Sequence, residues 1–330
     1  MALALVTGIG GQDGGYLAEQ LVAAGHRVHG TVSGGAGGPL PAHLAALGDA
    51  LTVHTADLRD PGALPGLVDD VGPDWVFNLA GASSVAASWA DPVGTLDVNG
   101  RAVLALLEHL FRRAEEGAPV RLVQASSGEV FAGATGGPVT EASPVSPVNP
   151  YGVAKAVAHR SVGMYRERGL HASSLVLFNH ESPRRPERFV TRKITRGVAA
   201  IAAGRADRLV LGNLDVRRDW GWAPDYTAAM LLAAEAPEAG DYVVATGVAH
   251  SLRDLVAAAF AEVGIADWEP LLASDPSLVR PADAEVLVGD PSRLRERLGW
   301  APTVGFEEMV ATMVRTDLAE LSADEGETRR

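Results

Sequence analysis

Apolar runs of strand length alternate with helix-length segments through the first half of the chain. A helical example is residues 92–113, in which apolar residues recur at the spacing of one helix face. Strands that alternate with helices indicate βαβ units and hence parallel strands. The pattern predicts an α/β fold with a doubly wound parallel sheet of the Rossmann type. The predicted strands are residues 2–7, 27–32, 51–58, 74–81, 120–127 and 171–178.

The pattern changes near residue 179, where the chain becomes more helical and locally basic, as in "RRPERFVTRK" and "VRRDWGW". We predict a main domain over residues 1–178 and a smaller, mostly helical C-terminal lobe over residues 179–330. Segments of this lobe are expected to interleave with the main sheet. The polar tail "SADEGETRR" is expected to fray.

The composition narrows the possible functions. The chain has 330 residues, of which 47% are hydrophobic, so a sizeable core is expected. Its net charge of −13 argues against nucleic acid or an anionic membrane surface as the main partner. The sequence contains no cysteine, which excludes disulfides and thiolate chemistry, and we expect no metal site. The early glycines and the lack of a long apolar run predict a cytoplasmic protein without a membrane span.

A glycine-rich turn directly follows the first predicted strand. In "TGIGGQDGGYL", Gly8, Gly11 and Gly14 form the pattern G-x-x-G-x-x-G at the start of a predicted helix. Such glycines permit a tight turn and a close approach of the backbone to a pyrophosphate. The helix N-terminus then presents free N–H groups to the phosphates. We therefore predict that residues 1–178 bind a dinucleotide.

The choice between NAD and NADP is left open by the segment after the second predicted strand. An acidic residue there would bind an adenosine ribose, and an arginine would favour a 2′-phosphate. This chain instead has "TVSGGAGGPL", in which neither charge occurs.

A tyrosine and a lysine lie four residues apart in "NPYGVAKAVAH". Asn149 is a plausible helix N-cap, and Pro150 suits the first helical position. Tyr151 and Lys155 would then share one helix face. A nearby ammonium group favours the phenolate, so we expect Tyr151 to act as a base near neutral pH. Ser126 or Ser127, at the end of the preceding strand, could bind the hydroxyl that loses its proton.

The glycine turn, Ser127 and the Tyr151-x-x-x-Lys155 pair resemble the extended short-chain dehydrogenase/reductases. More narrowly, "QASSGEVF", "LFNHESPRRPERFVTRKITRG" and "LGNLDVRRDWGWAPDY" resemble the GDP-mannose 4,6-dehydratase family. The resemblance covers most of the chain and weakens between residues 33 and 47. Its most specific part is residues 177–197.

This resemblance implies a 4,6-dehydration of a GDP-sugar, in which a second acid/base is needed beside the serine and tyrosine. Tyr151 would take the O4 proton, Ser127 would orient the hydroxyl, and Lys155 would hold the ribose. Glu129 would remove the C5 proton and assist loss of the C6 hydroxyl. On one extended strand end, Ser127 and Glu129 would project to the same side. The alternative is that Glu129 makes only a structural hydrogen bond.

The resemblance also implies which residues hold the ligands. A tightly bound NADP or NAD, regenerated in each cycle, would contact Gly8, Gly11, Gln12, Asp13, Gly14, Asp57, Leu58, Leu79, Ala80, Gly81, Tyr151, Lys155, His180 and Arg185. The GDP-sugar would contact Asn179, Val190, Lys193, Arg218, Arg280 and Asp283. A homodimer is implied through segments 92–113 and 150–168.

The chain departs from the family pattern at three places. The arginine pair that follows the second strand in the family reads Ser33 and Gly34 here. A stretch of the Ala-Gln-Ser-His type reads "GASS" at residues 81–84, and Gly94 stands where the family has tyrosine. These changes suggest an altered GDP-sugar or an altered reaction. We therefore keep a GDP-sugar 4-epimerase as the alternative activity, and a non-catalytic dinucleotide sensor as a less favoured one.

Overall fold

The computed structural model describes residues 1–34, 40–275 and 285–328. A seven-stranded sheet forms its centre, in the order β10-β6-β5-β4-β1-β2-β3, and every neighbouring pair is parallel. The order reverses between β1 and β4, which confirms the predicted doubly wound sheet. The strands are β1 (Leu3–Thr7), β2 (Arg27–Val32), β3 (Leu51–Thr55), β4 (Trp75–Asn78), β5 (Arg121–Ala125), β6 (Ala172–Leu177) and β10 (Asp241–Val244).

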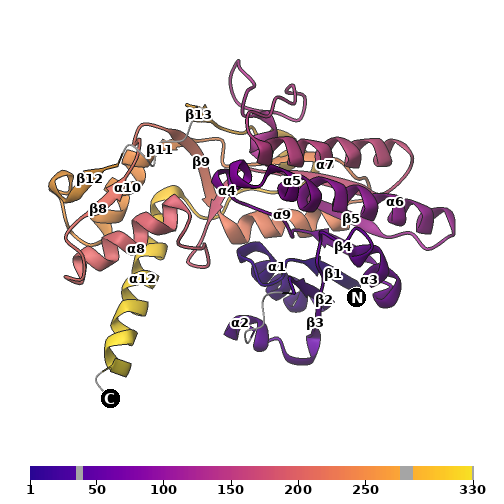
Figure 1. The fold of residues 1–330 in the computed structure, drawn as a ribbon, viewed down its shortest axis with the longest axis horizontal. Coiled ribbons are helices and arrows are strands. Elements are labelled where there is room, and N and C mark those ends of the chain that lie inside the picture. Colours follow the sequence, from indigo (N-terminus) through magenta and orange to yellow (C-terminus); the bar gives the residue numbers. More distant parts are fainter. Residues whose placement is uncertain (35–39, 276–284, 329–330) are drawn as a thin grey trace.

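Helices cover both faces of this sheet (Figure 1). One face packs against α1 (Gln12–Ala23) and α9 (Ala223–Glu235), and the other against α3 (Ala63–Val71), α6 (Ala102–Glu115) and α7 (Pro150–Glu167). Neighbouring strand residues alternate between the two cores, because successive side chains of a strand point to opposite faces. Shorter helices are α2 (Ala42–Ala45), α4 (Val85–Ala90), α5 (Pro92–Leu96), η1 (Gly48–Ala50) and η3 (Gly128–Phe131).

The helix predicted over residues 92–113 is not continuous. A π-helical turn, η2 (Asp97–Arg101), separates α5 from α6. This turn buries Asn99, whose side-chain amide accepts from the Ala82 N–H at 2.9 Å and donates to the Ala82 carbonyl at 2.8 Å. The extra residue of the π turn thus places a polar side chain against the loop that follows β4.

The smaller lobe is built around β9 (Arg217–Trp222), which pairs with β7 (Asn179–Glu181), β11 (Ala249–Ser251) and β13 (Val286–Leu287). Its own core lies between this sheet and three helices, α8 (Val190–Ala202), α10 (Leu252–Glu262) and α12 (Phe306–Thr328). The remaining elements are β8 (Leu209–Leu211), β12 (Leu272–Ser274), η4 (Glu269–Leu271) and α11 (Ser292–Leu298).

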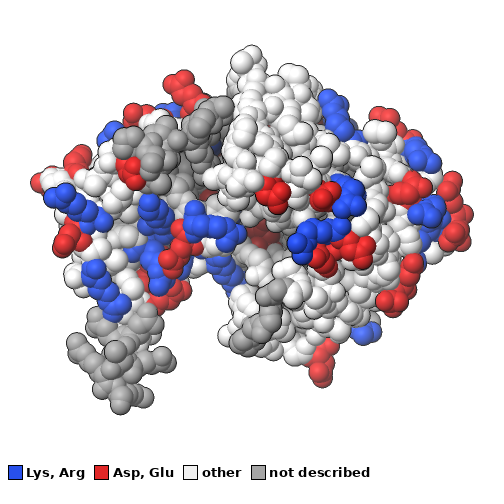
Figure 2. All heavy atoms as spheres, viewed as in Figure 1, with Lys and Arg blue, Asp and Glu red and all other residues white. Residues whose placement is uncertain are grey.

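The chain passes between the two parts more than once. After β9 it returns through α9 to β10, which is the edge strand of the main sheet beside β6. On the face shown in Figure 2, lysine and arginine side chains gather over the smaller lobe, in the region of α8. In the parts of the chain that the structure describes, no helix combines the length and the apolar character that crossing a membrane requires.

A buried ion pair fastens α12 to α8. The Arg192 guanidinium forms an ion pair with the Asp317 carboxylate at 2.8 Å, and their side chains are 5% and 0% exposed. Arg192 also donates to the Pro183 carbonyl, which brings the turn before α8 into the same contact. Burial raises the pKa of Asp317, although Thr195 and Arg192 oppose the shift. The positive charge of Arg192 therefore helps to keep the buried Asp317 carboxylate ionised.

We expect Arg192→Leu to lower the free energy of unfolding by about 3 kcal/mol, because it removes the nearer ion-pair partner of the buried Asp317 and leaves Arg196 at 3.8 Å. Urea unfolding measures the change. Arg253→Leu is the matched control, since Arg253 and its partner Asp215 are 50% and 79% exposed and such a pair contributes at most about 1 kcal/mol. Equal losses in the two variants would contradict the assignment.

Candidate active site

Hydrogen bonds between side chains join the carboxyl ends of β1, β4 and β5. Thr7 donates to the Asn78 side-chain oxygen at 2.8 Å, and Asn78 donates to the Gln124 side-chain oxygen at 2.8 Å. The Thr7 hydroxyl also accepts from the N–H groups of Leu79 and Ala80, each at 3.0 Å. The sequence reasoning missed this set. The signal in the sequence is a polar residue near the carboxyl end of three strands whose central residues are apolar.

The glycine turn after β1 has the shape expected of a pyrophosphate cradle. Gly8 has φ +70°, and a Cβ there would lie 2.9 Å from the Ala80 Cα. A Cβ on Gly14 would lie 2.5 Å from the Gly8 carbonyl oxygen, so only glycine fits. No side chain caps the N-terminus of α1, whose N-cap is Gly11. Its first N–H groups are thus available to an anion, and these residues fit the predicted dinucleotide.

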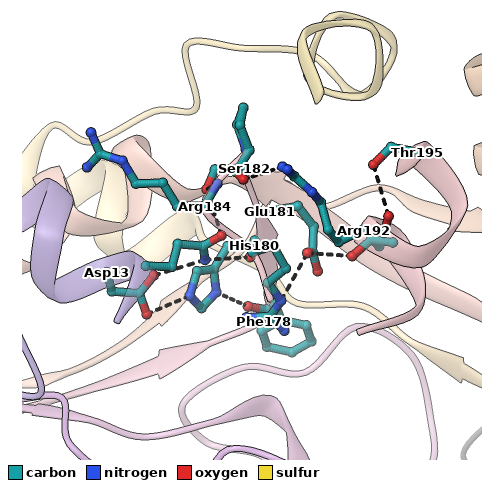
Figure 3. Close-up of polar contacts among 12 residues, drawn as sticks. Asp13, Phe178, His180, Glu181, Ser182, Arg184, Arg192 and Thr195 are labelled. Carbon is teal, nitrogen blue, oxygen red and sulfur yellow. Dashed lines mark hydrogen bonds and ion pairs between the residues drawn. The ribbon is translucent and has the colours of Figure 1, made fainter. Parts of the chain in front are cut away.

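Asp13, at the start of α1, binds His180 in the segment that enters the smaller lobe (Figure 3). His180 donates to the Asp13 carboxylate at 2.9 Å through Nε2 and to the Phe178 carbonyl at 2.7 Å through Nδ1. Both ring nitrogens face acceptors, so the ring is an imidazolium. Burial alone would lower the pKa of His180, but the charge and hydrogen bond of Asp13 outweigh it and raise the pKa.

Gln12 completes this connection between the two parts of the molecule. Its side-chain nitrogen donates to the His180 carbonyl at 3.1 Å, and its oxygen accepts from the Ser182 hydroxyl at 2.7 Å. Next to them, Arg185 pairs with the buried Glu181 at 3.1 Å and stacks on the Phe189 ring. Gln12, Asp13, His180 and Arg185, all predicted cofactor residues, therefore lie in one cluster.

Two of the predicted cofactor residues lie just beyond the end of β3. Asp57 accepts hydrogen bonds from the side chain of Arg59 and from its backbone N–H, and these lower the pKa of Asp57 to about 2. Leu58 is half-buried beside it and packs on the core under α3. Ser33 and Gly34 follow β2, and residues 33–42 contain no lysine or arginine. No charge in this segment is available to a 2′-phosphate.

Tyr151 and Lys155 are placed by the first turns of α7. Asn149 caps the helix by accepting from the Gly152 N–H at 2.8 Å, and Pro150 is its first residue, which confirms both predictions. The Lys155 ammonium is buried and donates to the Ala125 carbonyl at 3.0 Å. It lies 5.9 Å from the centre of the Tyr151 ring. Gly81 approaches the same ammonium, since a Cβ there would lie 3.8 Å from Nζ.

The predicted lowering of the tyrosine pKa by lysine is wrong for this geometry. Burial raises the pKa of Tyr151 to about 12, and a hydrogen bond with the Ser127 hydroxyl offsets only part of that shift. Burial also lowers the pKa of Lys155 to about 8, because an ammonium loses its hydration there. Desolvation of the phenolate thus outweighs the two groups that lower the pKa of Tyr151, which are Ser127 and Arg185.

Glu129 lies in η3 and not on an extended strand end, so that part of the prediction is also wrong. β5 ends at Ala125, and Ser127 becomes the N-cap of η3, accepting from the Glu129 N–H at 3.2 Å. The Glu129 carboxylate accepts from the Asn149 side chain at 2.8 Å. Its charge is among the causes that raise the pKa of Tyr151. A tight turn, and not strand alternation, therefore brings the glutamate beside the serine and tyrosine.

The predicted substrate residues are spread over the smaller lobe. Asn179 lies in β7 next to Trp220 of β9, Val190 begins α8, Lys193 is half-buried one turn later, and Arg218 is buried in β9. Arg280 and Asp283 lie outside the described residues. The structure thus brings the catalytic and cofactor candidates together, and it carries the substrate candidates on three elements of the facing lobe.

The departures from the family pattern have local structural causes. Ser84 caps α4 by accepting from the Ala87 N–H at 3.1 Å. Asp91 caps α5 by accepting from the Gly94 N–H at 2.9 Å, and a Cβ on Gly94 would lie 2.2 Å from that carboxylate. A larger residue at position 94 would require the Asp91 cap to move. Ser88 of α4 accepts from the Tyr151 N–H at 3.1 Å, which joins this helix to the start of α7.

The chain is similar to known proteins in sequence and in fold over nearly its whole length. Residues 5–313 match a family model described as GDP-mannose 4,6 dehydratase. The chain is 42% identical over 325 residues to GDP-mannose 4,6 dehydratase 2 of Arabidopsis thaliana, covering 96% of this chain and 87% of that protein. The UDP-glucose 4-epimerase of Thermus thermophilus in complex with NAD is 28% identical, with a TM-score of 0.81 and coverages of 96% and 98%. The RMD protein of Pseudomonas aeruginosa, complexed with NADPH, is 26% identical, with a TM-score of 0.79 and coverages of 97% and 100%.

The uncharged segment after β2 generates a prediction about the cofactor. We expect the chain to bind NADP less than about 100-fold more tightly than NAD, a difference of about 2.7 kcal/mol. Ser33→Arg should raise the affinity for NADP roughly tenfold, because it supplies a charge for the 2′-phosphate, whereas Ser33→Ala should not. Titration calorimetry with both cofactors measures the ratio. A larger preference for NADP in the unaltered protein would contradict the prediction.

Proposed function

The chain belongs to the GDP-mannose 4,6-dehydratase family, and we propose that Ser127, Glu129, Tyr151 and Lys155 carry out its reaction. It is an NAD(P)-dependent GDP-sugar 4,6-dehydratase, an enzyme that forms a 4-keto-6-deoxy sugar with loss of one water. The observation that carries the assignment is the carboxylate of Glu129 beside Ser127 and Tyr151. Oxidation at C4 alone needs no such carboxylate, whereas elimination across C5 and C6 needs a second acid/base.

The first step is removal of a proton from O4. Tyr151 takes this proton, and the Ser127 hydroxyl holds O4 in place through a hydrogen bond. Because the pKa of Tyr151 is about 12, the phenol loses its proton readily only where positive charge is added to that of Lys155. A bound oxidised nicotinamide would supply that charge and the hydride chemistry between C4 and C6.

The second step is loss of water. The 4-keto group acidifies C5, and Glu129 removes the C5 proton. Glu129 then gives a proton to the C6 hydroxyl, which leaves as water. A proton equivalent to the one that Tyr151 took from O4 returns to C5, so the net change is the loss of one water. One carboxylate can serve both transfers because it is deprotonated before the elimination and protonated during it.

The GDP group is proposed to bind across the smaller lobe. Asn179, Lys193 and Arg218 lie on β7, α8 and β9, which face the main sheet. A guanidinium group can bind two phosphate oxygens at once, and an ammonium adds a point charge. The basic side chains near α8 support this placement (Figure 2).

Two copies of the chain are proposed to associate through α5, α6 and α7. Apolar side chains are exposed there, including Val93 (70%), Leu104 (43%), Val153 (46%), Val157 (38%) and Met164 (63%). Two of them, Val93 and Val153, line an apolar cavity of about 540 Å³ between the α4–α5 region and the start of α7. An apolar face of this kind indicates a protein interface.

The cytoplasmic location expected from the sequence stays a prediction.

For the reaction, we expect Tyr151→Phe to reduce all turnover by more than about 1,000-fold. Glu129→Gln should reduce water loss by at least about 100-fold and leave C4 oxidation intact, so that reduced cofactor accumulates on the enzyme. In deuterated water, the product of the unaltered enzyme should be one water lighter than the substrate, apart from one deuterium at C5. Mass spectrometry after incubation with a panel of GDP-sugars measures the mass of the product and its deuterium content.

Two outcomes would contradict this proposal in different ways. A product of unchanged mass without deuterium at C5 would establish the 4-epimerase instead. Near-normal dehydration by Glu129→Gln would show that the glutamate is structural.

For assembly, we expect a dimer that does not form a stable tetramer, because residues 33–42 contain no charged side chain for a further contact. Light scattering across micromolar dilution measures the mass. Val157→Glu should give monomers, since it buries a charge in the proposed interface, whereas Val210→Glu, at a similarly exposed apolar residue (40%) in β8, should leave the dimer intact. A tetrameric mass at every concentration would contradict this.

A further inference from the structure

Two backbone hydrogen bonds fix η3 against the segment that leads into α7. The Ser146 N–H donates to the Val130 carbonyl at 2.9 Å, and the Gly133 N–H donates to the Ser146 carbonyl at 2.8 Å. The first turn of α7 then lies directly on η3. A Cβ on Gly152 would lie only 2.7 Å from the Glu129 carbonyl oxygen, so the helix can approach this closely only with glycine there. Glu129 and the start of α7 therefore form one compact unit.

Asn149 uses both ends of its side-chain amide in this unit. Its oxygen accepts from the Gly152 N–H at 2.8 Å, which caps α7, and its nitrogen donates to Glu129 Oε2 at 2.8 Å. The cap decides the orientation of the amide, because only the oxygen can accept from an N–H group. The nitrogen must then face the carboxylate. Asn149 is 7% exposed, so water has little access to replace either bond.

We propose that Asn149 is the positioning residue for Glu129 in the elimination step, an inference that rests on the proposed function. Its hydrogen bond occupies Oε2 of the carboxylate. Among the described residues, no side chain or backbone group binds Oε1, so this oxygen is the one that exchanges protons with the substrate. The same amide caps the helix that carries Tyr151 and Lys155. It thereby fixes the C5 base relative to the group that acts at O4.

The choice of asparagine follows from this double use. Serine, aspartate and asparagine cap helices about equally well, so capping alone does not require an amide. Only asparagine combines the cap acceptor with an N–H donor for Glu129. A serine would keep the cap and remove the donor, and an aspartate would keep the cap and place a second carboxylate against Glu129. These two substitutions therefore separate the two roles.

The test compares Asn149→Ser and Asn149→Asp with the unaltered full-length enzyme in complex with its cofactor and GDP-mannose. We expect both variants to unfold at nearly the same temperature as the unaltered enzyme and to oxidise C4 at nearly its rate. Water loss should fall by about 10- to 100-fold, more in Asn149→Asp, because a small displacement of a catalytic group costs about this much. Reduced cofactor should accumulate, and deuterium should enter C5 more slowly.

Ser143→Ala is the matched control. Its hydroxyl accepts from the Thr140 N–H at 3.0 Å in the same connection between η3 and α7, and it binds neither Glu129 nor the helix. This variant should dehydrate at the normal rate. A crystal structure of Asn149→Ser should show α7 starting at the same residue and the Glu129 carboxylate turned to a new position.

The inference is overturned if Asn149→Ser dehydrates at the normal rate, or if C4 oxidation and water loss fall by the same factor in both variants. Either result would show that Asn149 acts only as a helix cap. Glu129→Gln, measured in parallel, distinguishes this from failure of the proposed function. If that variant blocks water loss while Asn149→Ser does not, the role of Glu129 holds and only the role of Asn149 is lost.

Discussion

The hydrogen bonds that join Thr7, Asn78 and Gln124 constrain the whole site. Three buried polar side chains at one edge of an apolar sheet must satisfy one another, because each lost hydrogen bond there costs about 1–3 kcal/mol. Satisfying them fixes the ends of β1, β4 and β5 relative to each other. The glycine turn, the loop at residues 79–82 and the segment with Ser127 and Glu129 all begin at these three ends. Their relative positions are therefore set by the sheet.

A second set of contacts fixes the smaller lobe relative to these strand ends. The imidazolium of His180 and the side chain of Gln12 bind the start of α1 to the first strand of that lobe. The negative charge of Asp13 would otherwise oppose an anion at the helix N-terminus, and His180 compensates it. The phosphate-binding turn and the proposed sugar-binding lobe are thus held together by one charged pair that is largely shielded from water.

Burial shifts the pKa values of Tyr151 and Lys155 in opposite directions. Burial raises the pKa of Tyr151 to about 12 and lowers that of Lys155 to about 8, so near pH 7 Lys155 stays mainly an ammonium while Tyr151 stays a neutral phenol. Glu129 keeps a hydrogen-bond donor, Asn149, and is half-exposed. Tyr151 and Glu129 are both partly exposed, and they differ in their hydrogen-bond partners, which are Ser127 for the tyrosine and Asn149 for the glutamate.

The sequence by itself determined the sheet, the glycine turn, the cap at Asn149 and the pairing of Tyr151 with Lys155 on one helix face. These features follow from local rules: the two periodicities, the need for glycine at a positive φ and the preferences of helix ends. Tertiary structure alone decided the turn that holds Glu129, the π-helical turn at Asn99 and the direction of the pKa shift at Tyr151. Each of these depends on groups distant in sequence, such as Asn149 for Glu129 and Ala82 for Asn99, and on burial by the folded chain, which no spacing of residues encodes.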